Sequence, residues 1–202
     1  MIDDRDIMVT DRTRLRLKYL EVRKALSSFD SFIRSWAIQA RLITSNLFCK
    51  AKVIGLYYPI LNEVQTFRII TYSLSHFKTI CLPAVVDGRL LFYKYESIMG
   101  LQKGKYNIME PIYDNIYMNH ELDLLIIPGI VFDFFGNRIG YGKGYYDKLI
   151  SSLDRKKCTI AGLGYNFQVH PQEIEYFDHD AKLDALFTEA ETRFFRPGLE
   201  ET

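Results

Sequence analysis

The sequence predicts an α/β fold, a three-layer sandwich around a largely parallel sheet with a Rossmann-like arrangement. Short apolar runs that suit buried strands alternate along the chain with segments whose apolar residues recur every three or four positions, as in amphipathic helices. Apolar residues make up 48% of the 202 residues, which is enough for one full core. We therefore expect a single domain over residues 1–202.

The first predicted elements are helices. Between residues 12 and 47, apolar side chains keep a three- to four-residue spacing throughout. Ser27, Ser28 and Asp30 are candidate caps, so two helices with a break at 27–30 fit this stretch better than one long helix.

Three arginines would share one side of the first helix. Arg12, Arg16 and Arg23 follow one another at spacings of four and seven residues, which places them near one another on a helical surface. Such a basic face can be merely solvated, or it can be directed at a phosphate. The spacing alone does not separate these two interpretations.

The segment after residue 50 is predicted to contain a strand and a helix. Residues 52–60 form an apolar run that Pro59 ends. Asn62 is a candidate cap for the helix that follows. Glu63 would then lie at the first turn of that helix, where a carboxylate is favourable against the helix dipole.

A hairpin and a loop region follow. Residues 79–86 have the pattern of a strand, and Asp87-Gly88 predicts a tight turn into another strand at 89–95. Residues 97–121 are polar with weak periodicity, so we expect a loop region there.

The most informative stretch begins with a predicted buried strand, Leu124 to Ile127, bounded by Pro128-Gly129. A helix is predicted from Tyr145 onward. Between this strand and this helix lie four glycines within nine residues, Gly136, Gly140, Gly142 and Gly144. Two further strands are predicted at 158–165 and 185–188, with a polar connection between them.

The glycine-rich loop indicates an anion site. Glycine lets a backbone approach a ligand closely, and exposed amides beside the cations Arg138 and Lys143 suit a phosphate. Asp147, just inside the helix, is a hard oxygen ligand that could hold Mg²⁺ against a nucleotide. The alternative is a tight glycine turn with incidental charges.

The loop matches neither of the two commoner phosphate-binding motifs. GxxxxGK[ST] would need a Ser or Thr at Gly144, directly after Lys143. GxGxxG would need its last glycine at Asp147. The four histidines are scattered and have no metal-ligand spacing, which gives little support to a zinc site or a Ser-His-Asp hydrolase.

Net charge and composition limit the kinds of partner that we expect. A net charge of +1 gives no global reason to expect nucleic acid or a charged membrane as partner. The N-terminus lacks the apolar core of a signal peptide, and no run approaches the length of a membrane span. The three cysteines form no CxxC pair and are expected to be reduced. We expect a cytoplasmic monomer that binds small molecules.

At the glycine loop the sequence resembles a known family, the 5-formyltetrahydrofolate cyclo-ligases, also called methenyltetrahydrofolate synthetases. The central match consists of Pro128-Gly129, Phe132-Asp133, Gly136, Arg138 and GYGKGYYD at 140–147. Weaker matches fall in the expected order over nearly the whole chain: RTRLR at 12–16, RKALS at 23–27, YYPILNEVQT at 57–66, LP at 82–83, EP at 110–111 and HDAKLDALFTE at 179–189.

The resemblance implies an ATP- and Mg²⁺-dependent ligase. Such enzymes convert 5-formyltetrahydrofolate to 5,10-methenyltetrahydrofolate and release ADP and phosphate. ATP phosphorylates the formyl oxygen, N10 of the folate attacks the activated carbon, and phosphate leaves as the ring closes. Positioning and charge neutralisation do most of the work in phosphoryl transfer, which suits the loop's composition.

The resemblance also implies roles for residues that match its motifs. Lys143, Arg138 and Tyr145 would act in catalysis, and Asp147 and Asp184 would bind Mg²⁺. The ATP contacts would be Arg12, Thr13, Arg14, Leu15, Arg16, Arg138, Gly140, Gly142, Lys143, Gly144, Tyr145 and Tyr146. The folate contacts would be Tyr58, Glu63, Tyr141, Gly142, Lys143, Gly144 and Tyr145.

Two other functions stay open at this point. A related ATP-dependent ligase or kinase-like enzyme could act on another formyl or carboxylate compound. A non-catalytic nucleotide-binding domain could bind ATP without turnover, although Lys143, Asp147 and Glu63 are all present, which disfavours it.

Overall fold

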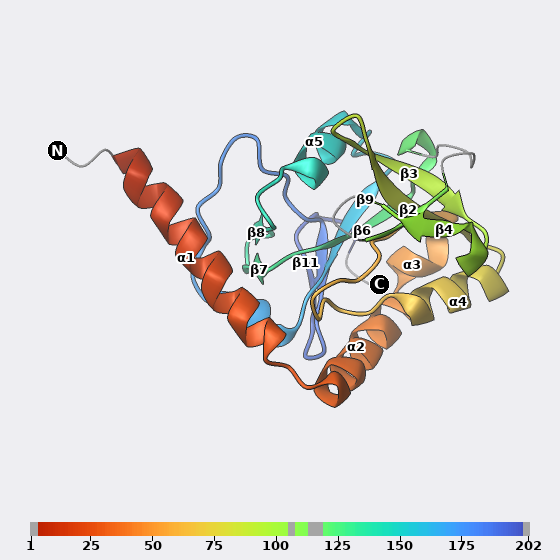
Figure 1. Cartoon of the computed structure of the whole chain (residues 1–202), viewed down its shortest axis with the longest axis horizontal. Coiled ribbons are helices and arrows are strands. Elements are labelled where there is room, and N and C mark those ends of the chain that lie inside the picture. Colours follow the sequence, from red (N-terminus) through yellow and green to blue (C-terminus); the bar gives the residue numbers. More distant parts are fainter. Residues whose placement is uncertain (1–3, 105–107, 113–118, 200–202) are drawn as a thin grey trace.

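A seven-stranded sheet runs through the computed structural model, which describes residues 4–104, 108–112 and 119–199. The strand order is β11-β10-β9-β6-β1-β2-β3 (Figure 1). The strands are β1 (Val53–Gly55), β2 (Thr79–Val86), β3 (Arg89–Tyr95), β6 (Leu124–Pro128), β9 (Thr159–Leu163), β10 (Ala185–Phe187) and β11 (Thr192–Phe194). The five inner strands are parallel, and the two edge strands, β3 and β11, are antiparallel to their neighbours.

Helices cover both faces of this sheet. Adjacent residues of β6 point to opposite sides, because side chains alternate along a strand. Leu124 joins a core with α2 (Ser28–Ile43), α3 (Asn46–Lys50) and α4 (Phe67–Ser75), while Leu125 joins a core with α5 (Tyr145–Ser152). The predicted three-layer α/β architecture with a largely parallel sheet is confirmed.

Helix α1 (Asp4–Lys24) lies outside these layers. Leu15 and Tyr19 pack on Val131 and Ile139, which belong to a small hairpin of β7 (Val131–Phe132) and β8 (Arg138–Ile139). Figure 1 shows the N-terminal end of α1 reaching beyond the rest of the molecule. The helix is thereby held at its C-terminal half, next to the stretch that follows β6.

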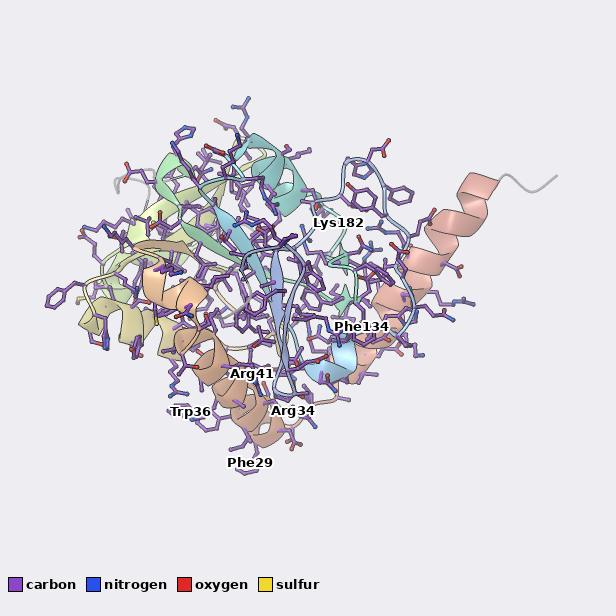
Figure 2. All side chains as sticks on the ribbon, turned by 180° about the vertical axis from the view of Figure 1, so that it is seen from behind. Phe29, Arg34, Trp36, Arg41, Phe134 and Lys182 are labelled. Atoms are coloured by element: carbon purple, nitrogen blue, oxygen red, sulfur yellow. The ribbon has the colours of Figure 1, made fainter. Side chains whose placement is uncertain are left out.

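The predicted break between the first two helices is confirmed. Helix α1 ends at Lys24 and α2 begins at Ser28. Ser27 caps α2, because its hydroxyl accepts a hydrogen bond from the Asp30 amide at 3.0 Å. Along α2, buried Ser31, Ser35 and Ile38 face the core, whereas Phe29 and Trp36 point outward in Figure 2.

The prediction for residues 52–60 was wrong in extent, and so was the cap at Asn62. The strand ends at Gly55, and α4 begins only at Phe67, so Glu63 precedes the helix instead of lying in its first turn. Asn62 has a φ of +57° and donates its amide hydrogens to the carbonyls of Arg23, Lys24 and Leu26. It therefore satisfies the end of α1, because the last carbonyls of a helix have no partner within it.

The predicted hairpin is confirmed, and the expected loop at 97–121 is only partly irregular. Asp87 and Gly88 have φ values of +48° and +74°, as a tight hairpin turn requires. The segment also contains an antiparallel ribbon of β4 (Leu101–Lys103) and β5 (Met109–Pro111) and short 3₁₀ turns, η1 (Ile98–Gly100) and η3 (Asn119–Glu121). Residues 105–107 and 113–118 of this predicted loop lie outside the described residues.

One 3₁₀ turn, η4 (Asn166–Gln168), follows β9. Among the described residues, the helices are all too short or too polar to cross a lipid bilayer.

Candidate functional site

A cavity of about 860 Å³ opens at the carboxyl ends of β1 and β6, where parallel α/β sheets commonly bind ligands. Its walls come from helix α1, from strands β2 and β3, and from the segment that follows β1. The stretch 128–147 and the segment 177–180 complete them. The glycine loop forms one wall. The cavity therefore gathers residues that lie up to 168 positions apart, as for Arg12 and Asp180.

The glycine loop has the backbone shape that the sequence predicts. Gly142 and Gly144 have φ values of +86° and +65°, the left-handed region that glycine adopts without strain. Gly144 is also the N-cap of α5, and it has no side chain to cover the first amides of the helix. Those amides and the helix dipole favour an anion at this end of the cavity.

Arginines of α1 flank the loop. Arg16 donates from Nε to the Gly140 carbonyl at 2.8 Å, and its pKa is lowered by burial and by neighbouring Arg12. Arg12 donates to Asp180 at 2.5 Å and to the Glu175 carbonyl at 2.9 Å. The alternative of a merely solvated basic face is therefore wrong for these two arginines, since both line the cavity.

The two loop cations differ in environment. Arg138 is buried, with 5% of its side chain exposed, and burial lowers its pKa. Its Nη2 donates to Oδ1 of Asp147 at 2.7 Å, while its Nε is buried without a hydrogen-bond partner. Lys143 is exposed at the cavity and forms neither a hydrogen bond nor an ion pair with the described part of the chain.

Asp147 offers a carboxylate oxygen to the cavity. Its Oδ1 accepts from Arg138 and, at 3.2 Å, from the Ala181 amide. Its Oδ2 accepts no hydrogen bond from the residues that the structure describes. Of the two predicted metal ligands, Asp147 is therefore the one that lines the cavity together with the glycine loop.

The cavity lining also includes a buried carboxyl group, that of Glu63. Burial raises the pKa of Glu63 to about 7, although the charge of Arg23 and the hydrogen bond from the Ile60 amide at 3.1 Å both oppose the rise. Tyr141 contacts this group from the glycine loop, and burial followed by the Glu63 charge raises the pKa of its phenol to about 12. Tyr58 lines the same region, with its ring 5.5 Å from that of Phe67.

The structure brings most of the predicted site residues together. The cavity lining includes Arg12, Arg16, Tyr58, Glu63, Arg138, Gly140, Tyr141, Gly142, Lys143, Gly144, Tyr145, Tyr146 and Asp147. Thr13 and Arg14 are exposed and Leu15 packs on the α1 core, so these three do not line it. On a helix, residues one to three positions from Arg12 point elsewhere.

The structure does not bring Asp184 to Asp147. Asp184 is buried outside the cavity lining, where its Oδ1 accepts from Arg155 at 2.6 Å and its Oδ2 accepts from the Ile160 amide at 2.7 Å. Arg196 lies 3.5 Å from the second oxygen. Both oxygens are thus engaged. Within the described ranges no three His, Cys, Asp or Glu side chains form a group that could hold a metal ion.

Other cavity residues were missed from the sequence. Ile108 and Glu110 come from the β4–β5 ribbon, whose strands are too short to show periodicity. Phe177 stacks under Arg12 at 4.7 Å, and Asp180 pairs with that arginine. A signal existed for Asp180, which stands in the HDAKLDALFTE motif.

Fold and site together define a class of protein. Four cations, a glycine loop and an uncapped helix N-terminus lie at the carboxyl edge of a parallel sheet, and the buried carboxyl group of Glu63 lines the same cavity. The protein is an α/β protein whose cavity suits a phosphate at the glycine loop and offers a buried carboxyl group to hydrogen-bond donors of a second ligand.

Comparisons with known proteins identify the family. The model of the 5-formyltetrahydrofolate cyclo-ligase family matches residues 8–189, and the chain belongs to this family. The mouse 5-formyltetrahydrofolate cyclo-ligase is 29% identical over 188 residues, covering 87% of this chain and 92% of the relative. The enzyme of that name from Haemophilus influenzae is 27% identical over 173 residues, covering 83% and 92%.

A solved structure agrees with the fold. The NMR structure of Aquifex aeolicus 5,10-methenyltetrahydrofolate synthetase superposes with a TM-score of 0.83 and is 32% identical. The superposition covers 95% of this chain and 96% of that one.

Proposed function

We propose that the protein cyclises 5-formyltetrahydrofolate to 5,10-methenyltetrahydrofolate, with ATP as co-substrate and ADP and phosphate as products. One observation carries the proposal: a single cavity is lined both by the cationic glycine loop and by the buried Glu63, which contacts Tyr141 of that loop. The phosphates of ATP suit the cationic part, and the N–H donors of a folate suit the part around Glu63, the folate end.

The residues divide between the two substrates by charge. Arg12, Arg16 and Lys143 would bind phosphate oxygens together with the loop amides, and the unpartnered Nε of Arg138 adds a further donor. Tyr58, Glu63 and Tyr141 would contact the folate. Donors fixed around a transferring phosphoryl group stabilise the charge that develops on it, which is the main catalytic term in this chemistry.

The reaction needs the two substrates side by side. The formyl oxygen of the folate takes the terminal phosphoryl group, and ADP leaves. N10 then attacks the activated formyl carbon, the C–O bond to phosphate breaks, and the five-membered ring closes. Lys143 of the glycine loop and Tyr145, the first residue of α5, both line the cavity. There they would orient the phosphoryl group between ATP and the formyl oxygen.

Mg²⁺ belongs to the proposal. Nucleotide sites commonly bind this ion through one or two carboxylates and the substrate phosphates, so a single suitable oxygen is sufficient from the protein. Oδ2 of Asp147 is that oxygen, since Oδ1 is engaged by Arg138 and Ala181. When bound, the ion would neutralise phosphate charge. Asp184 is not part of the proposed metal site.

The test is a spectroscopic assay. Purified protein with 5-formyltetrahydrofolate and Mg-ATP should give the near-ultraviolet absorbance of the methenyl product and one ADP per product. ADP release only with another formyl or carboxylate compound would point to the related ligase instead. ATP binding without any turnover would point to a non-catalytic domain. The monomeric state and the cytoplasmic location stay predictions.

A further inference from the structure

Arg23 is a fully buried arginine that lies behind the folate end of the cavity. It is 0% exposed and is not among the residues that line the cavity. A buried charge is unfavourable unless it is paired and hydrogen-bonded, and a leucine or methionine would fill such a place in a core without that penalty. Packing alone therefore does not explain an arginine at position 23.

The guanidinium of Arg23 donates to three separate segments. Nε donates to the Leu61 carbonyl at 3.2 Å, in the segment after β1. Nη1 donates to the Gly129 carbonyl at 3.0 Å, directly after β6. Nη2 donates to the Tyr141 hydroxyl of the glycine loop at 2.5 Å. One side chain thus joins α1 to three walls of the cavity, in the fork geometry that only arginine provides.

The same guanidinium supplies the charge opposite Glu63. Nη2 lies 3.9 Å from Oε1 of Glu63, and 1% and 4% of the two side chains are exposed. The other titratable groups beside this carboxyl are phenols, whose pKa values its charge helps to raise: Tyr57 after β1, Tyr141 in the loop, and Tyr146 of α5. Tyr165, the N-cap of η4, donates to the Glu63 carbonyl oxygen at 3.4 Å. Among the described residues Arg23 is the cation that acts on Glu63.

We propose that Arg23 is a positioning residue for the folate end of the site, which fixes the Tyr141 hydroxyl and supplies the positive charge against which the Glu63 carboxylate is buried. This inference rests on the proposed function. Arg23 would act through Tyr141 and Glu63, without touching either substrate.

The proposal has a signature in the pH dependence. Burial raises the pKa of Glu63, and the charge of Arg23 opposes that rise. Without this cation the pKa of Glu63 rises above about 7, so that at neutral pH the carboxyl group is mostly protonated. The acid limb of kcat/KM for the folate should then move to higher pH, since that limb reports the free enzyme's essential groups.

The experiment compares Arg23→Met, Arg23→Lys and the control Lys24→Met with the wild type. Lys24 is the next residue on α1 and is exposed, so its variant removes a neighbouring charge from the same turn. For each protein, kcat/KM for 5-formyltetrahydrofolate and for ATP is measured between pH 5.5 and 9. Folding is checked by circular dichroism and by the Kd for ATP.

The expected pattern separates positioning from a general loss of structure. Arg23→Met should lose about tenfold or more in kcat/KM for the folate at pH 7, roughly one charged hydrogen bond. Its acid limb should lie about one pH unit higher, and its Kd for ATP should stay within about twofold of the wild type. Arg23→Lys should restore the acid limb but not the full kcat/KM, because an ammonium cannot serve three acceptors in a fork.

The remaining outcomes would overturn either the proposed function or the role of Arg23. A wild type that forms no methenyl product overturns the proposed function and the inference with it. An active wild type with an Arg23→Met variant that matches Lys24→Met overturns the inference alone, as do equal losses for folate and ATP. If Arg23→Met does not fold, Arg23→Lys decides: a kcat/KM for the folate equal to that of the wild type overturns the inference.

Discussion

At the scale of single residues, Lys143 and Arg138 show how one loop separates function from folding. Lys143 is exposed and forms neither a hydrogen bond nor an ion pair with the described residues, so its charge is available to a ligand. Arg138 is buried and paired with Asp147, so it supports the loop as well as the site. Substitutions at the two positions should therefore have different consequences for stability.

Replacing Lys143 with alanine should reduce turnover and leave stability unchanged. Removing one preorganised donor at a developing charge reduces kcat by about 10²-fold or more. An exposed cation contributes little to the fold, so the melting temperature should stay within about 1 °C. The checks are steady-state ADP release and thermal unfolding, with Lys148→Ala as control, an exposed lysine of α5 outside the cavity. Parallel losses of activity and stability would contradict the role given to Lys143.

Replacing Asp147 with asparagine should affect both magnesium and the fold. The variant keeps the shape of the side chain but removes the charge that faces buried Arg138, which should reduce the free energy of unfolding by about 1–3 kcal/mol. It should also raise the Mg²⁺ concentration needed for half-maximal ADP release. Urea unfolding and a magnesium titration measure the two effects. An unchanged titration would remove Asp147 from the proposed metal site.

At the scale of elements, Asp133 holds together the hairpin that precedes the glycine loop. Its Oδ1 accepts from the amides of Phe135 and Asn137, and its Oδ2 accepts from the Ile174 amide and from the side chain of Asn137. The carboxylate is fully buried. It therefore fixes the turn between β7 and β8 and ties that turn to the segment after η4.

Replacing Asp133 with alanine should be severely destabilising. Three backbone amides and the side-chain amide of Asn137 would lose their acceptor, and each hydrogen bond to a charged group is worth about 1.5–3 kcal/mol. We expect a loss of about 3–5 kcal/mol in urea unfolding, because part of this deficit can be relieved by water. Asp154→Ala is the matched control, since its carboxylate accepts one exposed amide, from Lys156, and should lose under about 1 kcal/mol. A loss for Asp133→Ala as small as the control's would show that the hairpin does not depend on this carboxylate.

Elements with a strong local signal could be predicted from the sequence. The alternation of strands and helices, the Asp87-Gly88 turn and the cap at Ser27 each follow from nearby residues. The strands β7 and β8 have two residues each, which is too few for a period to be visible. The apolar run from residue 52 exceeds β1 because Leu56 and Tyr57 remain buried in the core beyond the end of the strand.

The site could be predicted where it is contiguous in sequence. Residues 138–147 supply much of one wall, and the family motif contains them all. Arg23 could be placed on the correct side of α1 but not given its role, because its partner Tyr141 lies 118 positions away. Asp184 belongs to a motif but is engaged by Arg155 and the Ile160 amide, contacts that no sequence pattern reveals.

At the scale of the whole molecule, the cavity requires a carboxyl group that destabilises the fold. The ordinary pKa of Glu63 would be 4.5, and burial raises it to about 7 in the folded protein. The folded state therefore keeps a proton between about pH 4.5 and pH 7 that the unfolded chain has released. Stability is favoured below this window and falls as the pH rises through it, by up to about 3 kcal/mol at about 1.4 kcal/mol per pKa unit.

Glu63→Gln should remove this dependence, because glutamine resembles the protonated acid and has no proton to release. Relative to the wild type, the variant's free energy of unfolding should rise by about 2–3 kcal/mol between pH 5 and pH 8, while its kcat/KM for the folate falls. Urea unfolding at several pH values measures the first effect, with Glu21→Gln, an exposed carboxylate of α1, as the control for lost charge. Wild-type and Glu63→Gln curves that stay parallel would mean that Glu63 is ionised in the folded state at pH 5. In that case the charge of Arg23 and the hydrogen bonds to Glu63 offset burial, and the pKa of this carboxyl group is the same in the folded and the unfolded protein.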